Sequence, residues 1–363
     1  MIASAEMGDS GGNTEYLKDA IIEQVVYAVI GIILYFVCMK ISAMKIRIEV
    51  YNVGYIAVLL MLLACRGFAP VNGAYAWFRF GGHTIQPSEF AKVFMILFGA
   101  KLFSVSDPEK NLRNFKIFAI ATFILFIVIA FVQHDFGSGV VLFVICYCIL
   151  MIPPYKEIRK YQNYMTLFVL IAIGFVLLLM SDFVTELMKK HADNYMIGRF
   201  LAAADPFLYR YDNGYHVIMA LVSFANGGIF GLGYGKSIHK YMNFPNPSND
   251  FILPVIVEEL GIIGFACFLI AYAFLLVPLI RISFKTKSVA TKMVLFGVFA
   301  YFIVHFILNV GGVSAIIPLT GVPLLLISSG GSSLLASMMG LGFAQNEIIR
   351  NKEIENESNS REI

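Results

Sequence analysis

The sequence predicts an all-α protein that crosses a membrane nine times, with one large outer loop between the sixth and seventh membrane helices. Hydrophobic residues make up 59% of its 363 residues and charged residues 14%, whereas soluble domains are about half apolar and about a quarter charged. The apolar residues also lie in solid runs. Such runs exclude a membrane β-barrel, because barrel strands alternate apolar and polar residues.

Nine apolar runs are the predicted membrane helices, and several approach the ~20 residues that a helix needs to cross hydrocarbon. They cover residues 20–39, 50–65, 88–105, 115–132, 138–153, 164–180, 251–280, 293–312 and 322–345. Lys and Arg gather after every odd-numbered run, and positive charge in short loops stays in the cytoplasm. We therefore expect the odd-numbered helices to end inside, which places the connections 66–87, 133–137, 181–250 and 311–321 outside.

The two ends follow from the same orientation. Residues 1–19 form a short outer segment without the basic and apolar regions of a cleavable signal peptide. Residues 347–363 form a cytoplasmic tail that is either disordered or a short helical extension. Because nine helices leave the N-terminus outside, we expect an earlier membrane helix to be missing from this chain.

Residues 181–250 form the one long polar segment, and a loop of more than ~15 residues is usually functional or disordered. This segment is too rich in Tyr, Phe and Leu for disorder. Residues 214–224 predict an amphipathic helix at the membrane interface, and a glycine-rich run follows from Gly227 to Gly235. No strand precedes Gly231-x-Gly-x-Gly235, which disfavours a dinucleotide-binding loop.

Other features argue against several kinds of site. The net charge of +3 comes from separated clusters, so nucleic acid is not an expected partner. All five cysteines lie in apolar runs, and Cys146 and Cys148 diverge on a helix, which makes them a poor metal pair. The serine-rich residues 328–333 favour close helix packing over a nucleophile. No motif demands a metal, and no cofactor is evident.

Ionisable residues at membrane depth are costly and therefore point to pairs or to functional sites. Glu89 and Lys92 share one face of a helix, as either a structural ion pair or part of a site. Glu258 and Glu259 lie side by side in the seventh helix, where one is a neutral acid or the partner of a backbone bend. The single intramembrane His305 favours hydrogen-bonded structure over a ligand.

Eight motifs in a fixed order resemble the SEDS family of bacterial shape, elongation, division and sporulation proteins, typified by FtsW, RodA and SpoVE. They are QPSEFAK at 86–92, QHDFGSG at 133–139, DPF at 205–207, GY at 214–215, GLGYGKSIHKY at 231–241, NDFI at 249–252, EELG at 258–261 and ISSGGSSLL at 327–335. The resemblance covers residues 20–346. It implies ten membrane helices, of which this chain lacks the first, and residues 1–5 resemble the outer end of that helix.

The resemblance implies a peptidoglycan glycosyltransferase of the bacterial cytoplasmic membrane. Such an enzyme polymerises lipid II on the outer face, leaves a glycan linked to undecaprenyl pyrophosphate, and works with a class B penicillin-binding protein. The essential aspartate of the family falls on Asp250. The Glu, His and Thr that usually precede it are replaced by Asn246, Ser248 and Asn249.

This chemistry requires one general base and cations that hold a diphosphate as charge develops. Asp250 is the predicted base, although Asp is also a favoured helix N-cap. Lys92, Arg199 and Lys240 are the predicted substrate-binding cations, with Glu89 as the partner of Lys92. A divalent cation that shares the diphosphate stays an open alternative.

Two other functions remain open at the level of sequence. A flippase for the lipid-linked precursor would use a polar path lined by Glu89, Lys92, Asp135 and Glu258. A catalytically silent scaffold for the penicillin-binding protein would account for the altered residues around Asp250.

Overall fold

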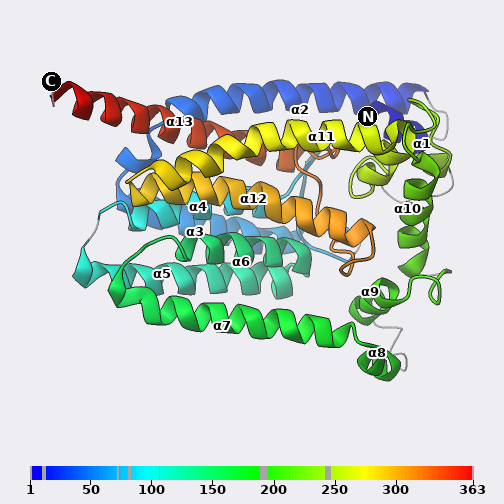
Figure 1. The fold of residues 1–363 in the computed structure, drawn as a ribbon, viewed down its shortest axis with the longest axis horizontal. Helices are drawn as coiled ribbons and strands as arrows, with labels where there is room; N and C mark the ends of the chain where they lie inside the picture. The colour runs from blue at the N-terminus through cyan, green and yellow to red at the C-terminus, as the bar shows by residue number, and fades with distance from the viewer. Residues whose placement is uncertain are drawn as a thin grey trace. The chain divides into compact units, whose positions relative to one another are not determined.

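The computed structural model describes residues 2–9, 14–71, 73–80, 83–105, 107–188, 195–211, 213–241 and 247–361, which are mostly α-helical (Figure 1). The helices are α1 (Ile2–Asp9), α2 (Thr14–Lys40), α3 (Ile48–Ala64), α4 (Pro87–Leu102), α5 (Pro108–Ile127), α6 (Phe136–Leu150), α7 (Lys156–Leu179), α8 (Asp182–Met188), α9 (Tyr195–Ala204), α10 (Asn213–Gly227), α11 (Ile252–Lys285), α12 (Val289–Val313) and α13 (Gly331–Arg361). Strands β1 (Phe78–Phe80) and β2 (His83–Ile85) form an antiparallel hairpin, and the short 3-10 helix η5 covers His239–Tyr241.

The nine predicted runs are confirmed as helical over most of their length, because they fall in α2–α7 and α11–α13. Within the described residues, α2, α3, α5, α7, α11 and α12 are each long and apolar enough to cross a membrane. α4 and α6 have only 16 and 15 residues, and the second half of α13 is polar. A total of nine crossings therefore stays a prediction.

Several boundaries differ from those predicted. α2 begins at Thr14 rather than at residue 20. α13 begins only at Gly331, because the chain before it contains Pro323, which has no amide donor, and Leu326, whose φ is 67°. α13 then continues to Arg361, so the described part of the tail is a helical extension. The hairpin of β1 and β2 lies in the 66–87 connection and was not predicted.

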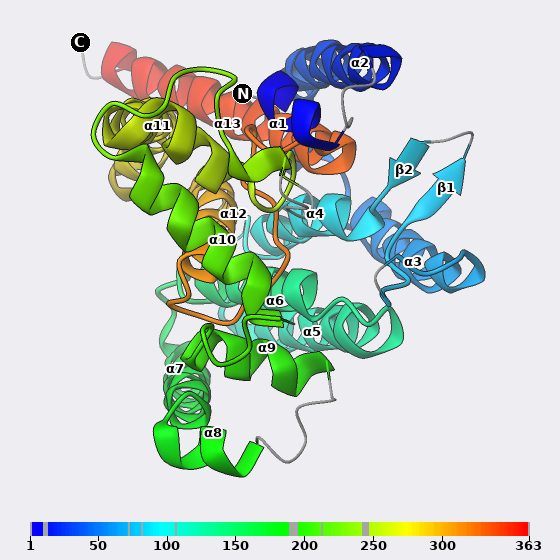
Figure 2. The same cartoon turned by 90° about the vertical axis from the view of Figure 1, so that its right-hand side faces the viewer.

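The 181–250 segment is structured over its described residues, as predicted. Figure 2 shows α8, α9 and α10 following one another between α7 and α11. α10 contains the whole stretch 214–224 that was predicted to form a helix.

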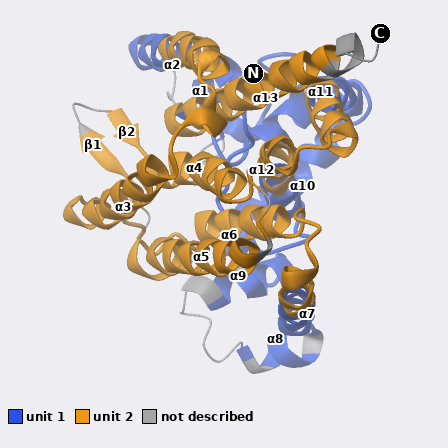
Figure 3. Ribbon diagram, turned by 90° about the vertical axis from the view of Figure 1, so that its left-hand side faces the viewer, with its two compact units in different colours: residues 1–25, 165–273, 305–330 blue, residues 26–164, 274–304, 331–363 orange. Residues whose placement is uncertain are grey.

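The chain forms two compact units, which are described separately (Figure 3). The first unit comprises residues 1–25, 165–273 and 305–330, and the second comprises residues 26–164, 274–304 and 331–363. In the second unit α4 is buried along most of its length. Glycine permits the close packing there, because a Cβ atom on Gly99 would lie 2.8 Å from the Phe118 ring.

The core of the first unit forms around the start of α11. Residues 251–257 are buried there together with Ala5 of α1, Ala220 of α10 and Leu324. Short side chains at Ala5 and Ala220 allow both helices to pack against this apolar stretch. The first residues of α11 are thus held by elements from distant parts of the sequence.

α11 is broken at Gly261, where the backbone adopts φ 68° and ψ −168°. A break inside a membrane helix frees amides and carbonyls that need new partners. Backbone groups of residues 228–233 supply them on both sides of the break: Leu232 N–H bonds to the Glu258 carbonyl (2.9 Å), Gly233 N–H to the Glu259 carbonyl (2.9 Å), Ile262 N–H to the Gly228 carbonyl (3.0 Å) and Ile263 N–H to the Ile229 carbonyl (3.2 Å).

This pairing explains the glycine-rich run. A Cβ atom on Gly227 would lie 2.1 Å from the Val257 carbonyl oxygen, and one on Gly231 would lie 2.2 Å from the Glu259 carbonyl oxygen. Gly231 also has a φ of 78°, which side chains rarely tolerate. The glycines therefore serve close backbone contact with the broken helix.

We predict that Gly231→Ala prevents stable folding, because its Cβ would collide with a backbone carbonyl that cannot move away. Gly235→Ala is the matched control, since Gly235 has the same φ of 78° but open space around it. Gly235→Ala should lower the free energy of unfolding by about 1–2 kcal/mol, because only the left-handed backbone conformation disfavours the new side chain. The apparent midpoint of thermal unfolding in detergent measures both, and equal shifts would show that the close contact is unimportant.

Candidate functional site

Asp250 lies in the turn 247–251, two residues before the first residue of α11, and its side chain is half-buried. The helix begins at Ile252, so Asp250 precedes the N-cap position of α11. Three consecutive carbonyls of this turn each accept a hydrogen bond from elsewhere in the first unit: Ser248 from the Ser329 amide (2.8 Å), Asn249 from the Ser328 hydroxyl (2.8 Å) and Asp250 from the Asn309 side-chain amide (3.0 Å).

Asn309 and Ser328 each make a second bond that ties the turn to the 321–330 segment. The Asn309 amide also donates to the Val322 carbonyl at 2.9 Å, and the Ser328 hydroxyl accepts from the Leu324 amide at 2.8 Å. The two side chains thus bridge the turn and the segment. Their role was not predicted from the sequence, where Ser328 was assigned to helix packing.

The Asp250 carboxylate faces the backbone of the same segment. A Cβ atom on Gly321 would lie 3.6 Å from Asp250 Oδ2, and Gly321 has a φ of 69°. His305 also contacts this segment, because its Nδ1 donates to the Pro323 carbonyl at 3.1 Å. The predicted structural role of His305 is confirmed by this bond.

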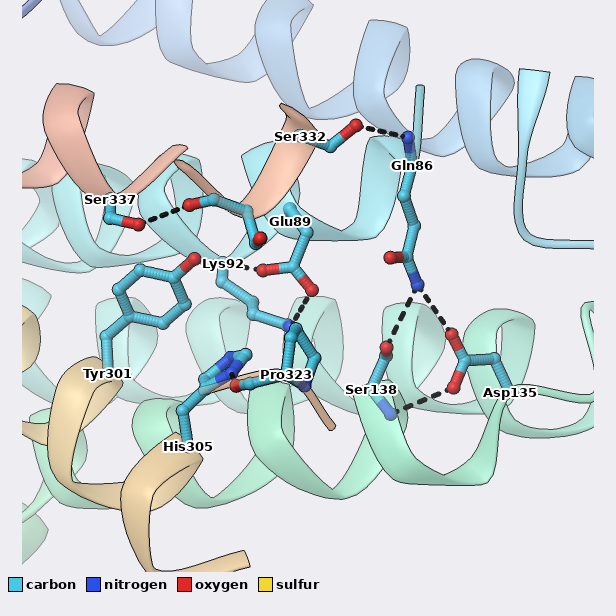
Figure 4. A network of polar contacts seen from close by, with 11 residues as sticks. Gln86, Glu89, Lys92, Asp135, Ser138, Tyr301, His305, Pro323, Ser332 and Ser337 are labelled. Carbon is cyan, nitrogen blue, oxygen red and sulfur yellow. Dashed lines mark hydrogen bonds and ion pairs between the residues drawn. The ribbon is translucent and has the colours of Figure 1, made fainter. Parts of the chain in front are cut away.

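In the second unit, Glu89 and Lys92 form the predicted ion pair (Figure 4). Lys92 Nζ lies 2.5 Å from Glu89 Oε1, and the two side chains are 0% and 1% exposed. The Tyr301 hydroxyl donates to the second Glu89 oxygen at 2.9 Å. Two donors thus satisfy a carboxylate that would be very costly to bury alone.

The Gln86 side chain joins two of the sequence motifs in the second unit (Figure 4). Its amide donates to Asp135 Oδ2 at 2.8 Å and to the Ser138 hydroxyl at 3.2 Å, while Asp135 Oδ1 accepts the Ser138 amide at 3.0 Å. The Gln86 backbone amide donates to the Ser332 hydroxyl at 2.9 Å. Asp135 therefore caps α6 and fixes the start of α4.

Lys240 is fully buried in the first unit, beside the break in α11. Its ammonium group donates to Glu259 Oε1 (2.9 Å), the Ser4 hydroxyl (2.8 Å) and the Gly235 carbonyl (2.9 Å). All three N–H groups have protein partners, so the structure gives Lys240 an ion-pairing role at the break. A contact between Lys240 and a diphosphate stays a prediction.

Glu258 and Glu259 are the partners of a backbone bend, which was one of the two predicted alternatives. Glu258 accepts from the Ser237 hydroxyl at 2.5 Å and lies 2.6 Å from His239 Nδ1. Together with the Lys240–Glu259 pair, these contacts attach the chain around η5 to α11. Both carboxylates are buried and bonded within one unit.

The predicted site residues thus fall in both units. Asp250 and Lys240 belong to the first, and Glu89 and Lys92 to the second. The Arg199 side chain and Asn246 lie outside the described residues. In the part of the chain that the structure describes, no three His, Cys, Asp or Glu side chains gather in the way that a metal site requires.

The long apolar helices and the buried polar clusters define a multi-pass helical membrane protein. The chain belongs to the FtsW/RodA/SpoVE family, described as "Cell cycle protein", whose model matches residues 1–353. The resemblance seen in the eight motifs is therefore confirmed. This family places the chain in the cytoplasmic membrane.

Two relatives come from Bacillus subtilis strain 168. A "Probable peptidoglycan glycosyltransferase FtsW" is 33% identical over 79% of this chain and 70% of its own length. "Stage V sporulation protein E" is 33% identical over 79% of this chain and 75% of its own length. Both relatives thus match the larger part of the chain.

Solved structures share the fold. One, titled "Structural coordination of polymerization and crosslinking by a peptidoglycan synthase complex", has a TM-score of 0.72 and 24% identity and covers 96% of this chain and 95% of its own. RodA of Thermus thermophilus has a TM-score of 0.62 and 21% identity, with 96% and 93% covered.

We predict that Glu89→Gln and Lys92→Met each destabilise the protein by about 3–5 kcal/mol, because each leaves one buried charge without its partner. The double variant should recover much of this loss. Arg47→Ala is the control, since the Arg47–Glu49 pair is 81% and 62% exposed and its loss should leave the unfolding midpoint nearly unchanged. Thermal unfolding in detergent measures all four, and additive losses in the double variant would contradict the buried pair.

Proposed function

We propose that this protein polymerises lipid II into glycan strands at the outer face of the cytoplasmic membrane, with Asp250 as the general base. The observation that carries the proposal is the anchoring of Asp250, whose turn is held by three consecutive carbonyl hydrogen bonds. Membership of the family and the printed names of the relatives support the same activity.

The reaction joins an acceptor sugar hydroxyl to the anomeric carbon of a lipid-linked donor. As the new carbon–oxygen bond forms, the bond from the anomeric carbon to the lipid diphosphate breaks, and the hydroxyl proton passes to the Asp250 carboxylate. The diphosphate leaves without a general acid because it is already a stable anion. Asp250 lies at the end of α11 opposite Arg281 and Lys285, which is the predicted outer end.

Cations that hold the diphosphate complete the proposal. Arg199 is a candidate, whereas Lys92 and Lys240 would each first have to leave a buried ion pair, with Glu89 and Glu259 respectively. A divalent cation bridging the diphosphate would add to these side chains. Titration of Mg²⁺ into chelator-treated protein measures that contribution.

A class B penicillin-binding protein is the proposed partner, supported by the peptidoglycan synthase complex that shares the fold. The flippase alternative is less well supported, because two carboxylates of its path, Asp135 and Glu258, are already bonded within their own units. A catalytically silent scaffold differs from the proposed polymerase only in lacking polymerisation activity, so an activity assay distinguishes the two.

We predict that the purified protein, alone or with its partner, forms glycan polymer from lipid II and that Asp250→Asn abolishes this while the protein still folds. Glu186→Gln, which alters an exposed carboxylate on α8 of the same outer segment, should behave like the parent. Polymer is measured by gel electrophoresis of labelled product. An active Asp250→Asn variant would refute the base, and an inactive parent under all conditions would favour the scaffold.

We also predict that Asn309→Ala and Ser328→Ala lower the polymerisation rate by about 10- to 100-fold, because displacing a catalytic group by about 1 Å has effects of this size. Ser328→Thr should retain activity, since it keeps the hydroxyl. Ser314→Ala is the control, because the Ser314 hydroxyl donates to the nearby Val310 and Gly311 carbonyls at the end of α12 and not to the turn. A Ser328→Ala rate equal to that of Ser314→Ala would show that the turn needs no such anchor.

A further inference from the structure

The 228–241 segment has an unusual distribution of polar and apolar side chains. Three of its four polar side chains, Ser237, His239 and Lys240, are buried against the carboxylates of α11, whereas Lys236 is exposed. Its large apolar and aromatic residues are instead exposed, with Phe230 79% exposed; the others are Ile229, Leu232, Tyr234, Ile238 and Tyr241. A loop surrounded by water has the opposite arrangement, because exposed apolar surface costs about 25 cal/mol per Å².

The position of this segment along α11 gives its depth in the membrane. Residues 262–280 contain no charged side chain, and these 19 residues of helix are about 28 Å long. The hydrocarbon layer is about 30 Å thick, so with Arg281 at the inner boundary Gly261 marks the outer boundary. The backbone bonds from residues 228–233 to both sides of Gly261 hold the segment at this level.

We infer that the 228–241 segment lies in the outer leaflet and that lipid covers its exposed face. Ile229 and Phe230 enter the acyl chains next to Ile262 and Ile263, which are also exposed on α11. Tyr234 and Tyr241 lie at the headgroups, where aromatic side chains with a polar tip are favoured. Lipid is the occupant because the segment is bonded directly to a helix that crosses the membrane.

Tryptophan fluorescence tests this inference in full-length protein reconstituted into phosphatidylcholine vesicles. The chain has one tryptophan, Trp77, so Trp77→Phe provides a silent background. Phe230→Trp is the reporter, and Ile229→Trp is a second reporter if the first is unstable. Phe274→Trp is the control for the acyl region, because Phe274 is 84% exposed within the uncharged part of α11. Tyr211→Trp, at 86% exposure in the outer segment, is the aqueous comparison.

Lipids brominated near the glycerol end of the acyl chain should remove most of the emission at position 230. Lipids brominated near the methyl end should quench position 274 more strongly than position 230. Iodide in the buffer should leave the tryptophan emission at positions 230 and 274 nearly unchanged. Strong quenching at position 230 by iodide would overturn the inference in favour of water, and protection from lipid bromine and iodide alike would overturn it in favour of a protein partner.

Discussion

Backbone amides and carbonyls inside a membrane need partners within the protein, and this constraint governs the first unit. The break of α11 at Gly261 exposes such groups, and residues 228–233 bond to both sides of it. Glycine is required where the two backbones touch. The buried pairs of Glu258 and Glu259 with residues 237–240 follow from the same contact, since they attach the segment that fills the break.

The break at Gly261 divides α11 into two parts with different roles. Residues 262–280 are apolar and belong to the part of α11 that can cross the membrane, whereas residues 252–260 form a short helix that follows the turn with Asp250. Hydrogen bonds again fix the geometry, because the turn before this short helix is held through its carbonyls by Asn309, Ser328 and Ser329. The backbone that carries the Asp250 carboxylate is thus held by three hydrogen bonds, which would serve the fixed position that the proposed general base needs.

The sequence predicted local features well and long-range contacts poorly. The helices follow from apolar run length, and the Glu89–Lys92 pair follows from a spacing of three residues on a helix. Asn309 and Ser328 were missed because they reach the turn across 59 and 79 residues of sequence. Asn309 could have been found as a polar residue in an apolar helix. The role of the glycine-rich run could not be predicted, because it depends on backbone contacts with the broken helix α11.

We propose that Asp250 moves a proton and that the residues around it, not its own side chain, hold the substrate. Lipid II binding and polymer formation measured on the same Asp250→Asn protein test this most directly. We expect a dissociation constant for lipid II close to that of the parent, together with loss of polymer. A parallel loss of binding would contradict it, because Asp250 would then hold the substrate or the fold.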